Sequence, residues 1–185
     1  MHFPEQEISK ELAGTERLLW TGSPRKGILF RGSDAFLIPF SILWCGFAIF
    51  WESMVIIQGA PFFFMLWGIP FVVVGLYFVF GRFIVEAKQR EKMAYGLTSQ
   101  RIIIISGMFS RKVQSLSLKT LSEITFKEKS DGSGTITFGA SNPMFAMFSG
   151  MSWPGTSQYL PPSFEMITDA KSVYEIVRRA QNEVQ

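Results

Sequence analysis

The chain has 185 residues, of which 48% are hydrophobic and 15% aromatic, and its 18 basic and 15 acidic side chains leave a net charge of +3. So small a basic excess argues against nucleic acid as a partner, and a single cysteine excludes a disulfide framework. The only histidine is His2, and no phosphate-cradling glycine motif is present. We therefore expect no catalytic, cofactor-binding or metal-binding residues and a protein that is not an enzyme.

Residues 1–33 form a polar leader rich in glutamate. Ile8 and Leu12 stand at helical spacing, which predicts a short surface helix near the start of the chain. The segment 17–21 (RLLWT) is strand-like and is expected to pair with the edge of a sheet further along the chain.

Two long apolar stretches, 35–51 and 60–80, follow the leader and contain no charged residue. About 20 apolar residues in a helix span the hydrocarbon core of a bilayer. Neither stretch has the polar stripe that a buried helix of a soluble protein keeps. The pattern predicts a transmembrane helical hairpin over residues 34–82, with spans at about 35–55 and 60–80. The absence of charge within these stretches argues against a proton relay or an ion site.

Basic residues flank the hairpin and predict its orientation. Arg25, Lys26 and Arg31 precede the first span, and four more basic residues lie between positions 82 and 92. The connecting loop 52–59 has none. By the positive-inside rule, both termini of this multi-pass protein are expected in the cytoplasm and the loop on the other side of the membrane.

Small residues recur along one face of each span. The recurring positions are Ser41, Cys45 and Ala48 in the first span and Gly68 and Gly75 in the second. Small side chains let helix backbones approach closely in lipid. These faces are expected either to pack the hairpin together or to mediate a homo-oligomer, and the pattern does not separate the two.

Residues 90–183 are predicted to form a small, mostly β domain. Strand patterns occur at 93–98, 101–106, 111–118, 124–127, 135–138 and 164–167. The run of four isoleucines at 102–105 is typical of a strand buried on both faces. The turn sequence 131–134 (DGSG) predicts a hairpin between the fourth and fifth of these strands.

The chain closes with a predicted amphipathic helix over 169–181, whose apolar face is Ala170, Val173, Val177 and Ala180. So short a helix needs a partner surface to be stable, and the sheet supplies one. The expected fold is a small antiparallel β-barrel or half-open roll that the helix plugs at one end.

The order of these motifs resembles the bacterial pleckstrin-homology-like domain that follows a pair of transmembrane helices. The motifs are ERLLWTGSP at 16–24, YGLTSQR at 95–101, SGMFSRK at 106–112 and VYEI at 173–176. The resemblance implies a bent, seven-stranded antiparallel sheet, or partly open barrel, capped by a C-terminal α-helix. It also implies a location in the bacterial inner membrane and no established catalytic activity.

Basic residues on this domain are the first candidate contacts. Domains of this class that grip inositol phosphates usually carry several basic residues at the first strand turn, whereas the turn 98–101 offers only Arg101. Arg111 and Lys112 add a diffuse basic patch in the next strand connection. Phosphoinositide recognition is therefore not supported, and loose attraction to anionic lipid head groups remains open. The alternative is that Thr98 and Arg101 only stabilise their turn.

The segment 142–162 is unusually apolar for a loop, which is typical of an interface. Its candidate contact residues are Met144, Phe145, Met147, Phe148 and Trp153. Three interpretations stay open: the segment folds back over the core of its own domain or replaces a strand, dips into the bilayer interface, or holds a partner protein.

Two functions from different classes fit these features. The first is a non-catalytic, membrane-anchored binding or scaffolding module that self-associates or contacts anionic lipid. The second is an accessory subunit of a larger membrane export or envelope-maintenance complex, with other membrane proteins as partners. A lipid-modifying enzyme is a remote third, because the sequence shows no polar cleft for it.

Overall fold

The computed structural model describes residues 4–28, 30, 34–107, 110–139 and 161–184. The chain divides into two compact units. One is the helical hairpin, chiefly Ile28–Glu86, and the other is a β domain formed by the residues before and after it.

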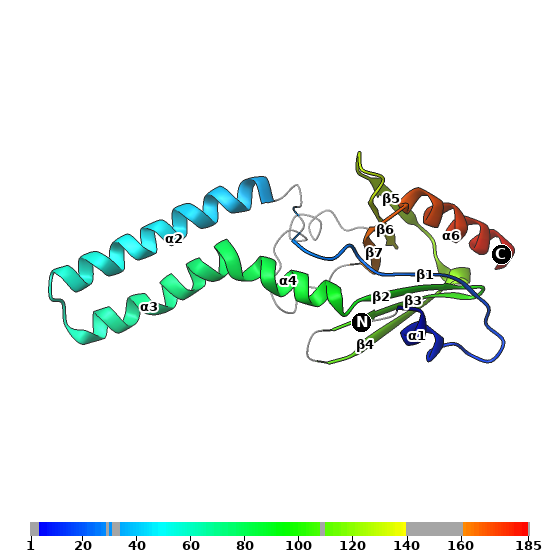
Figure 1. Ribbon diagram of the computed structural model, residues 1–185, viewed down its shortest axis with the longest axis horizontal. Helices are drawn as coiled ribbons and strands as arrows, with labels where there is room; N and C mark the ends of the chain where they lie inside the picture. The colour runs from blue at the N-terminus through cyan, green and yellow to red at the C-terminus, as the bar shows by residue number, and fades with distance from the viewer. Residues whose placement is uncertain (1–3, 29, 31–33, 108–109, 140–160, 185) are drawn as a thin grey trace. The chain divides into compact units, whose positions relative to one another are not determined.

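The hairpin consists of α2 (Asp34–Ile57) and a second helix that runs through α3 (Phe62–Leu76), a π-helical turn (Tyr77–Gly81) and α4 (Arg82–Glu91). Figure 1 shows α2 and α3 side by side, joined by a short loop. Both helices are long and apolar enough to cross a membrane, at 24 and 30 residues. Only 17% and 11% of their most apolar windows are buried, so neither is the core helix of a soluble protein.

The small-residue faces of the two helices lie between them. Ser41, Cys45 and Ala48 on α2 are buried, as are Gly68 and Gly75 on α3. A Cβ atom at position 75 would lie 3.0 Å from the Cα of Cys45. This close approach confirms that the two faces pack the hairpin together.

Charged side chains occur in the hairpin helices beyond the two uncharged stretches. Asp34, the first residue of α2, forms an ion pair with Arg82 at the start of α4. Oδ1 of Asp34 lies 3.0 Å from Nη2 of Arg82. Their side chains are only 8% and 5% exposed. Glu52 lies within α2, because the helix continues for more than a turn past the end of the first stretch. The hairpin is thus not free of charge, although residues 35–51 and 60–80 are.

The first sheet of the domain is antiparallel, in the order β1-β2-β3-β4. Its strands are β1 (Leu18–Gly22), β2 (Ala94–Thr98), β3 (Arg101–Ser106) and β4 (Lys112–Ser117). The strand-like segment of the leader therefore pairs with the sheet edge as predicted. All four isoleucines of β3 are buried, which confirms a strand covered on both faces.

A short 3₁₀ turn (Leu118–Thr120) leads to the second sheet, in the order β5-β6-β7. Its strands are β5 (Ile124–Glu128), β6 (Gly134–Phe138) and β7 (Ser163–Ile167), all antiparallel. The predicted β5–β6 hairpin is confirmed. Gly132 supplies the positive φ, +75°, that its turn requires.

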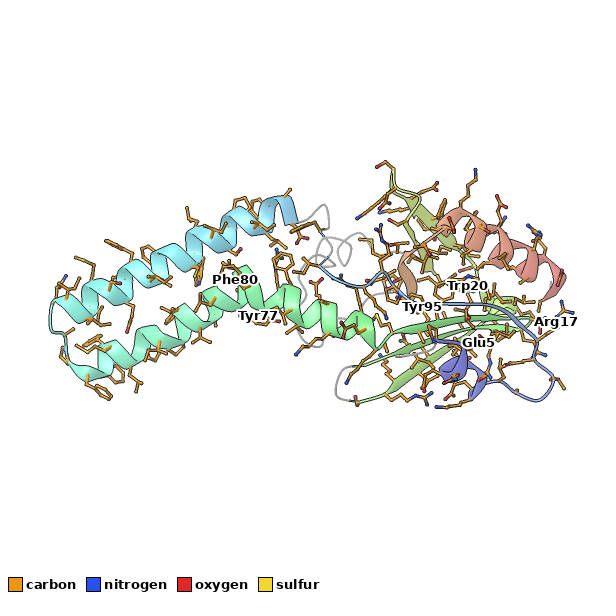
Figure 2. The ribbon with its side chains drawn as sticks, in the orientation of Figure 1. Glu5, Arg17, Trp20, Tyr77, Phe80 and Tyr95 are labelled. Carbon is orange, nitrogen blue, oxygen red and sulfur yellow. The ribbon has the colours of Figure 1, made fainter. Side chains whose placement is uncertain are left out.

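Both sheets and the terminal helix α6 (Ala170–Val184) enclose one core. The predicted helix face is confirmed, since Ala170, Val173, Val177 and Ala180 are all buried. Phe164 stands at the centre, with its ring 4.9 Å from that of Tyr95 and 5.4 Å from that of Trp20, both labelled in Figure 2. The described part of the chain therefore shows two apolar helices, two antiparallel sheets and a C-terminal helix, an arrangement that fits the predicted open sheet.

Candidate binding surface on the domain

The short helix α1 (Pro4–Ser9) occupies the face of the first sheet that is turned away from α6 (Figure 1). Its Ile8 is fully buried against Ala94, Ile103 and Ile105. A Cβ atom at Gly96 would lie 2.5 Å from Cγ2 of Ile8, so only glycine leaves room for this side chain. Burying an isoleucine stabilises a structure by about 2 kcal/mol, and this contact is therefore the main apolar attachment of α1.

Arg101, one of the predicted contact residues, is bound by the leader. Its Nε lies 2.7 Å from Oε1 of Glu16, and its Nη2 donates to Oε2 of the same carboxylate at 3.1 Å. Nη2 also donates to the carbonyl of Glu11 at 2.9 Å, and Nη1 donates to Oγ of Ser115. The side chain of Glu16 is 4% exposed and that of Arg101 is 29% exposed. This guanidinium has carboxylate and backbone partners within its own domain.

The turn that precedes β3 sets the position of Arg101. Oγ1 of Thr98 accepts hydrogen bonds from the backbone N–H groups of Gln100 and Arg101, at 3.2 and 2.9 Å. The same hydroxyl donates a hydrogen bond to the carbonyl of Arg101. Thr98 is fully buried. These hydrogen bonds stabilise the turn, as the alternative interpretation of Thr98 and Arg101 predicts.

Arg111 and Lys112 differ in their partners. Arg111 forms ion pairs with Glu11 at 2.8 Å and with Glu7 at 3.4 Å, and its side chain is 47% exposed. Lys112 is exposed, and its side chain forms no ion pair or hydrogen bond with any part of the chain that the structure describes. An exposed ion pair contributes about 0.5 kcal/mol, so the pairs on Arg111 hold the leader only weakly.

The structure thus brings together one apolar patch and the guanidinium of Arg111. We call the patch of Ala94, Gly96, Ile103 and Ile105, together with Arg111, the covered face. Lys112 pairs with Ser106, one position past Ile105, so its side chain points to the opposite face of the sheet. The predicted residues Met144, Phe145, Met147, Phe148 and Trp153 lie outside the described residues. Among the described residues, no group of three or more His, Cys, Asp or Glu side chains is placed to hold a metal ion.

The residues that occupy the covered face are Glu7, Ile8 and Glu11, and the sequence analysis did not assign them a role. The sequence does contain a signal for such a contact, because Glu7 and Glu11 are one helical turn apart and Ile8 lies beside them. A polar leader of this kind usually has a solvated face. The pattern therefore does not reveal a contact with positions about a hundred residues away.

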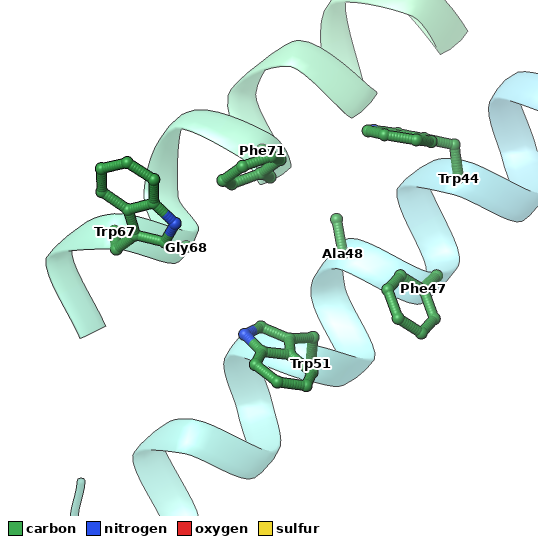
Figure 3. A pocket seen from close by; sticks show the side chains of 7 residues that line it. All are labelled: Trp44, Phe47, Ala48, Trp51, Trp67, Gly68 and Phe71. Atoms are coloured by element: carbon green, nitrogen blue, oxygen red, sulfur yellow. The ribbon is translucent and has the colours of Figure 1, made fainter. Parts of the chain in front are cut away.

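A second concave surface lies within the hairpin, between α2 and α3 (Figure 3). It encloses about 320 Å³. The lining residues are Trp44, Phe47, Ala48, Trp51, Trp67, Gly68 and Phe71. Oε2 of Glu52 is buried beside this surface with no hydrogen-bond partner among the described residues, and it would lie 1.7 Å from a Cβ atom at Gly68. A polar oxygen that is buried without a hydrogen bond costs free energy.

Comparisons with protein-family models, curated proteins and solved structures found no match to this chain.

Proposed function

We propose that the chain is a non-catalytic, membrane-anchored binding module. In this proposal the hairpin α2–α3 spans the bacterial inner membrane, both termini are cytoplasmic, and the β domain is a pleckstrin-homology-like fold that contacts anionic lipid or a second copy of the chain. Support for the anchor comes from two helices of 24 and 30 residues that are apolar and largely unburied. Support for the fold comes from the four-stranded and three-stranded sheets with α6 beside them.

The observation that carries a binding role is α1 seated on the first sheet. The sheet already holds a short helical segment through one buried isoleucine and ion pairs to Arg111. A surface that combines an apolar patch with a flanking arginine suits amphipathic, acidic ligands. Because the same chain carries the proposed anchor, even a weak contact at the membrane would be occupied.

The test of this function is the composition of the detergent-extracted protein. We expect the full-length chain to stay in the membrane pellet after an alkaline carbonate wash, and native mass spectrometry to show a homo-oligomer or a lipid-bound monomer. Release by carbonate would overturn the anchor. Stoichiometric foreign membrane proteins would replace this function with that of an accessory subunit.

The accessory-subunit function is kept as a second proposal because of the groove between α2 and α3. All five of its aromatic side chains are at least 42% exposed: Trp44, Phe47, Trp51, Trp67 and Phe71. Aromatic surface of that kind is what another transmembrane helix would pack against. The same mass measurement separates the two functions.

Orientation is tested with single cysteines in a Cys45→Ala background. Gln58→Cys stands in the loop between the helices, and Ser130→Cys stands in the β5–β6 turn of the domain. An impermeant maleimide is expected to label the first in intact spheroplasts and the second only after permeabilisation. The reverse pattern would place the domain outside the cytoplasm.

A further inference from the structure

We propose that the groove between α2 and α3 is a binding site for an apolar organic cation, a quaternary ammonium or phosphonium, which the aromatic rings surround and the carboxylate of Glu52 attracts. This inference rests on the membrane anchor of the proposed function, because the groove lies between the two helices that span the bilayer in that proposal. It adds a ligand-binding activity to a hairpin that otherwise serves as an anchor.

The carboxylate of Glu52 has no cation within the hairpin. From position 32 to position 81 the sequence contains no Lys, Arg or His, and its only acids are Asp34 and Glu52. Asp34 pairs with Arg82 at 3.0 Å, whereas Oε2 of Glu52 is buried without a hydrogen-bond partner among the described residues. An ionisable side chain in a membrane span is costly and marks a candidate functional site. A second copy in the same orientation brings no cation to this depth, so the counter-ion has to be another molecule.

The carboxylate meets the groove at Gly68. Oε2 of Glu52 lies where a side chain at position 68 would begin, 1.7 Å from the Cβ position, and Gly68 is also part of the groove lining. The missing side chain therefore leaves the acid next to the groove. The lining residues carry no side-chain oxygen. A hard metal ion needs several oxygen ligands, so this site does not suit one.

The rings of the groove suit a cation that needs no hydrogen-bond acceptors. Five of the seven lining residues are aromatic, three of them tryptophan, and Figure 3 shows that they come from both helices. A cation held over aromatic faces is attracted most strongly where water is excluded, and quaternary ammonium groups are bound by aromatic rings in this way. The groove supplies the rings, and Glu52 supplies the opposite charge beside them.

The size of the groove favours a small ligand over a partner helix. Its volume of about 320 Å³ falls within the range of small-molecule sites, roughly 300 to 1,000 Å³. The lining runs from Trp44 to Trp51 on α2 and from Trp67 to Phe71 on α3, about two turns and one turn of helix. Transmembrane helices pack through small residues. The small-residue faces of this hairpin are already used between α2 and α3.

The test is equilibrium dialysis of the full-length chain in mild detergent against tetraphenylphosphonium, with protein-free micelles as the blank. Tetraphenylborate, which has the same shape and the opposite charge, is the matched control ligand. We expect the phosphonium to bind stoichiometrically and the borate to bind more weakly by about tenfold or more, because the carboxylate attracts one ion and repels the other. The unfolding midpoint of the chain should rise with the phosphonium and not with the borate.

Two pairs of variants make the test specific. Glu52→Gln keeps the shape of the side chain without its charge and should weaken phosphonium binding about tenfold, whereas Glu128→Gln on the exposed end of β5 should not. Phe71→Leu removes one ring from the groove and should weaken binding about fivefold, whereas Phe62→Leu, outside the groove, should not. Slow maleimide labelling of the buried Cys45 in each variant would show that the hairpin remains packed.

The contrary outcomes are distinct. Equal binding of the two ions, no binding of either, or unchanged phosphonium binding by Glu52→Gln would overturn the inference while the anchor stands. A co-purifying membrane protein that blocks phosphonium binding would make a partner helix the occupant of the groove. If Glu52→Gln loosens the hairpin, the comparison of the two ions and the Phe71→Leu variant decide. Release of the chain from the membrane pellet by carbonate would instead contradict the proposed function.

Discussion

Glu16 and Arg101 lie 85 positions apart in sequence, yet both carboxylate oxygens of Glu16 contact the guanidinium of Arg101. Oε1 lies 2.7 Å from Nε, and Oε2 lies 3.1 Å from Nη2. The first residue stands just before β1 and the second begins β3. Since Glu16 is 4% exposed and Arg101 is 29% exposed, the two partners are unequal. Water can solvate the arginine if its partner is removed, but it cannot solvate the glutamate.

That inequality predicts a different cost for each substitution. Arg101→Gln should lower the free energy of unfolding by about 3 kcal/mol, because it leaves a buried carboxylate without its cation. Glu16→Gln should cost only about 1 kcal/mol, since it keeps a hydrogen-bond acceptor. Chemical denaturation of the detergent-solubilised chain measures both. Equal costs would contradict the burial of Glu16, and the double variant should cost less than the sum of the two.

Ile8 and Gly96 should be energetically coupled. Gly96→Ala is expected to cost about 2 kcal/mol, because its new methyl group overlaps the Ile8 side chain. Ile8→Ala should cost about 3 kcal/mol through the cavity it leaves. Together they should cost less than their sum, since the smaller side chain makes room for the methyl. Gly14→Ala, which meets no atom within 4 Å, is the matched control for the glycine substitution.

The close contact of Gly75 with Cys45 can be measured through the only thiol of the chain. Cys45 is buried against α3, so it should react slowly with maleimide in mild detergent. Gly75→Leu should separate the helices and speed labelling by about tenfold or more, because the interface requires small residues. Gly46→Leu adds the same side chain on the open side of α2 and should leave the rate nearly unchanged. Fast labelling of the parent chain would contradict the packed hairpin.

Asp131 predicts a loss of stability in acid. Hydrogen bonds from the hydroxyl and the backbone N–H of Ser133, and then the guanidinium of Arg25, lower the pKa of Asp131 from 3.8 to about 2. A carboxyl group whose pKa is lower in the folded state stabilises it above the unfolded pKa and loses that effect as the pH falls. The contribution should therefore be complete above about pH 4 and decline towards pH 2.

The measurement is the unfolding midpoint of the parent chain and of Asp131→Asn between pH 5 and pH 2, a range set by the usual carboxyl pKa. The asparagine can still accept the bonds from Ser133 but cannot titrate. The two curves should converge as the pH falls. A constant separation would show that the charge of Asp131 contributes nothing to folding.

Local patterns in the sequence were sufficient for most elements of the domain. The isoleucine strand β3, the turn before β6 and the apolar face of α6 each depend on residues within one short segment. Periodicity and turn chemistry report such segments directly. The hairpin was equally accessible, because the length of an apolar stretch is itself the signal.

The contacts of the leader were not accessible in the same way. Ile8 was recognised at helical spacing, but its position under Gly96 depends on how the sheet is assembled. The sequence predicts that Arg111 belongs to a diffuse basic patch, whereas in the fold its guanidinium forms ion pairs with Glu7 and Glu11. Pairing between charges a hundred residues apart leaves no periodic trace in either segment. The predicted interface 142–162 falls, apart from its last two prolines, outside the described residues.

The hairpin is inserted between β1 and β2, two strands that pair with each other. During synthesis β1 is complete before either helix exists, and its partner appears only after both have been made. Arg90 then donates to the carbonyl of Gly27, joining the segments that leave and re-enter the domain. In a bilayer, the two strands meet only if the chain crosses twice and returns to the side from which it started. Completion of the first sheet would therefore depend on correct insertion. A chain with a misplaced helix would keep an unpaired sheet edge, which is a template for aggregation.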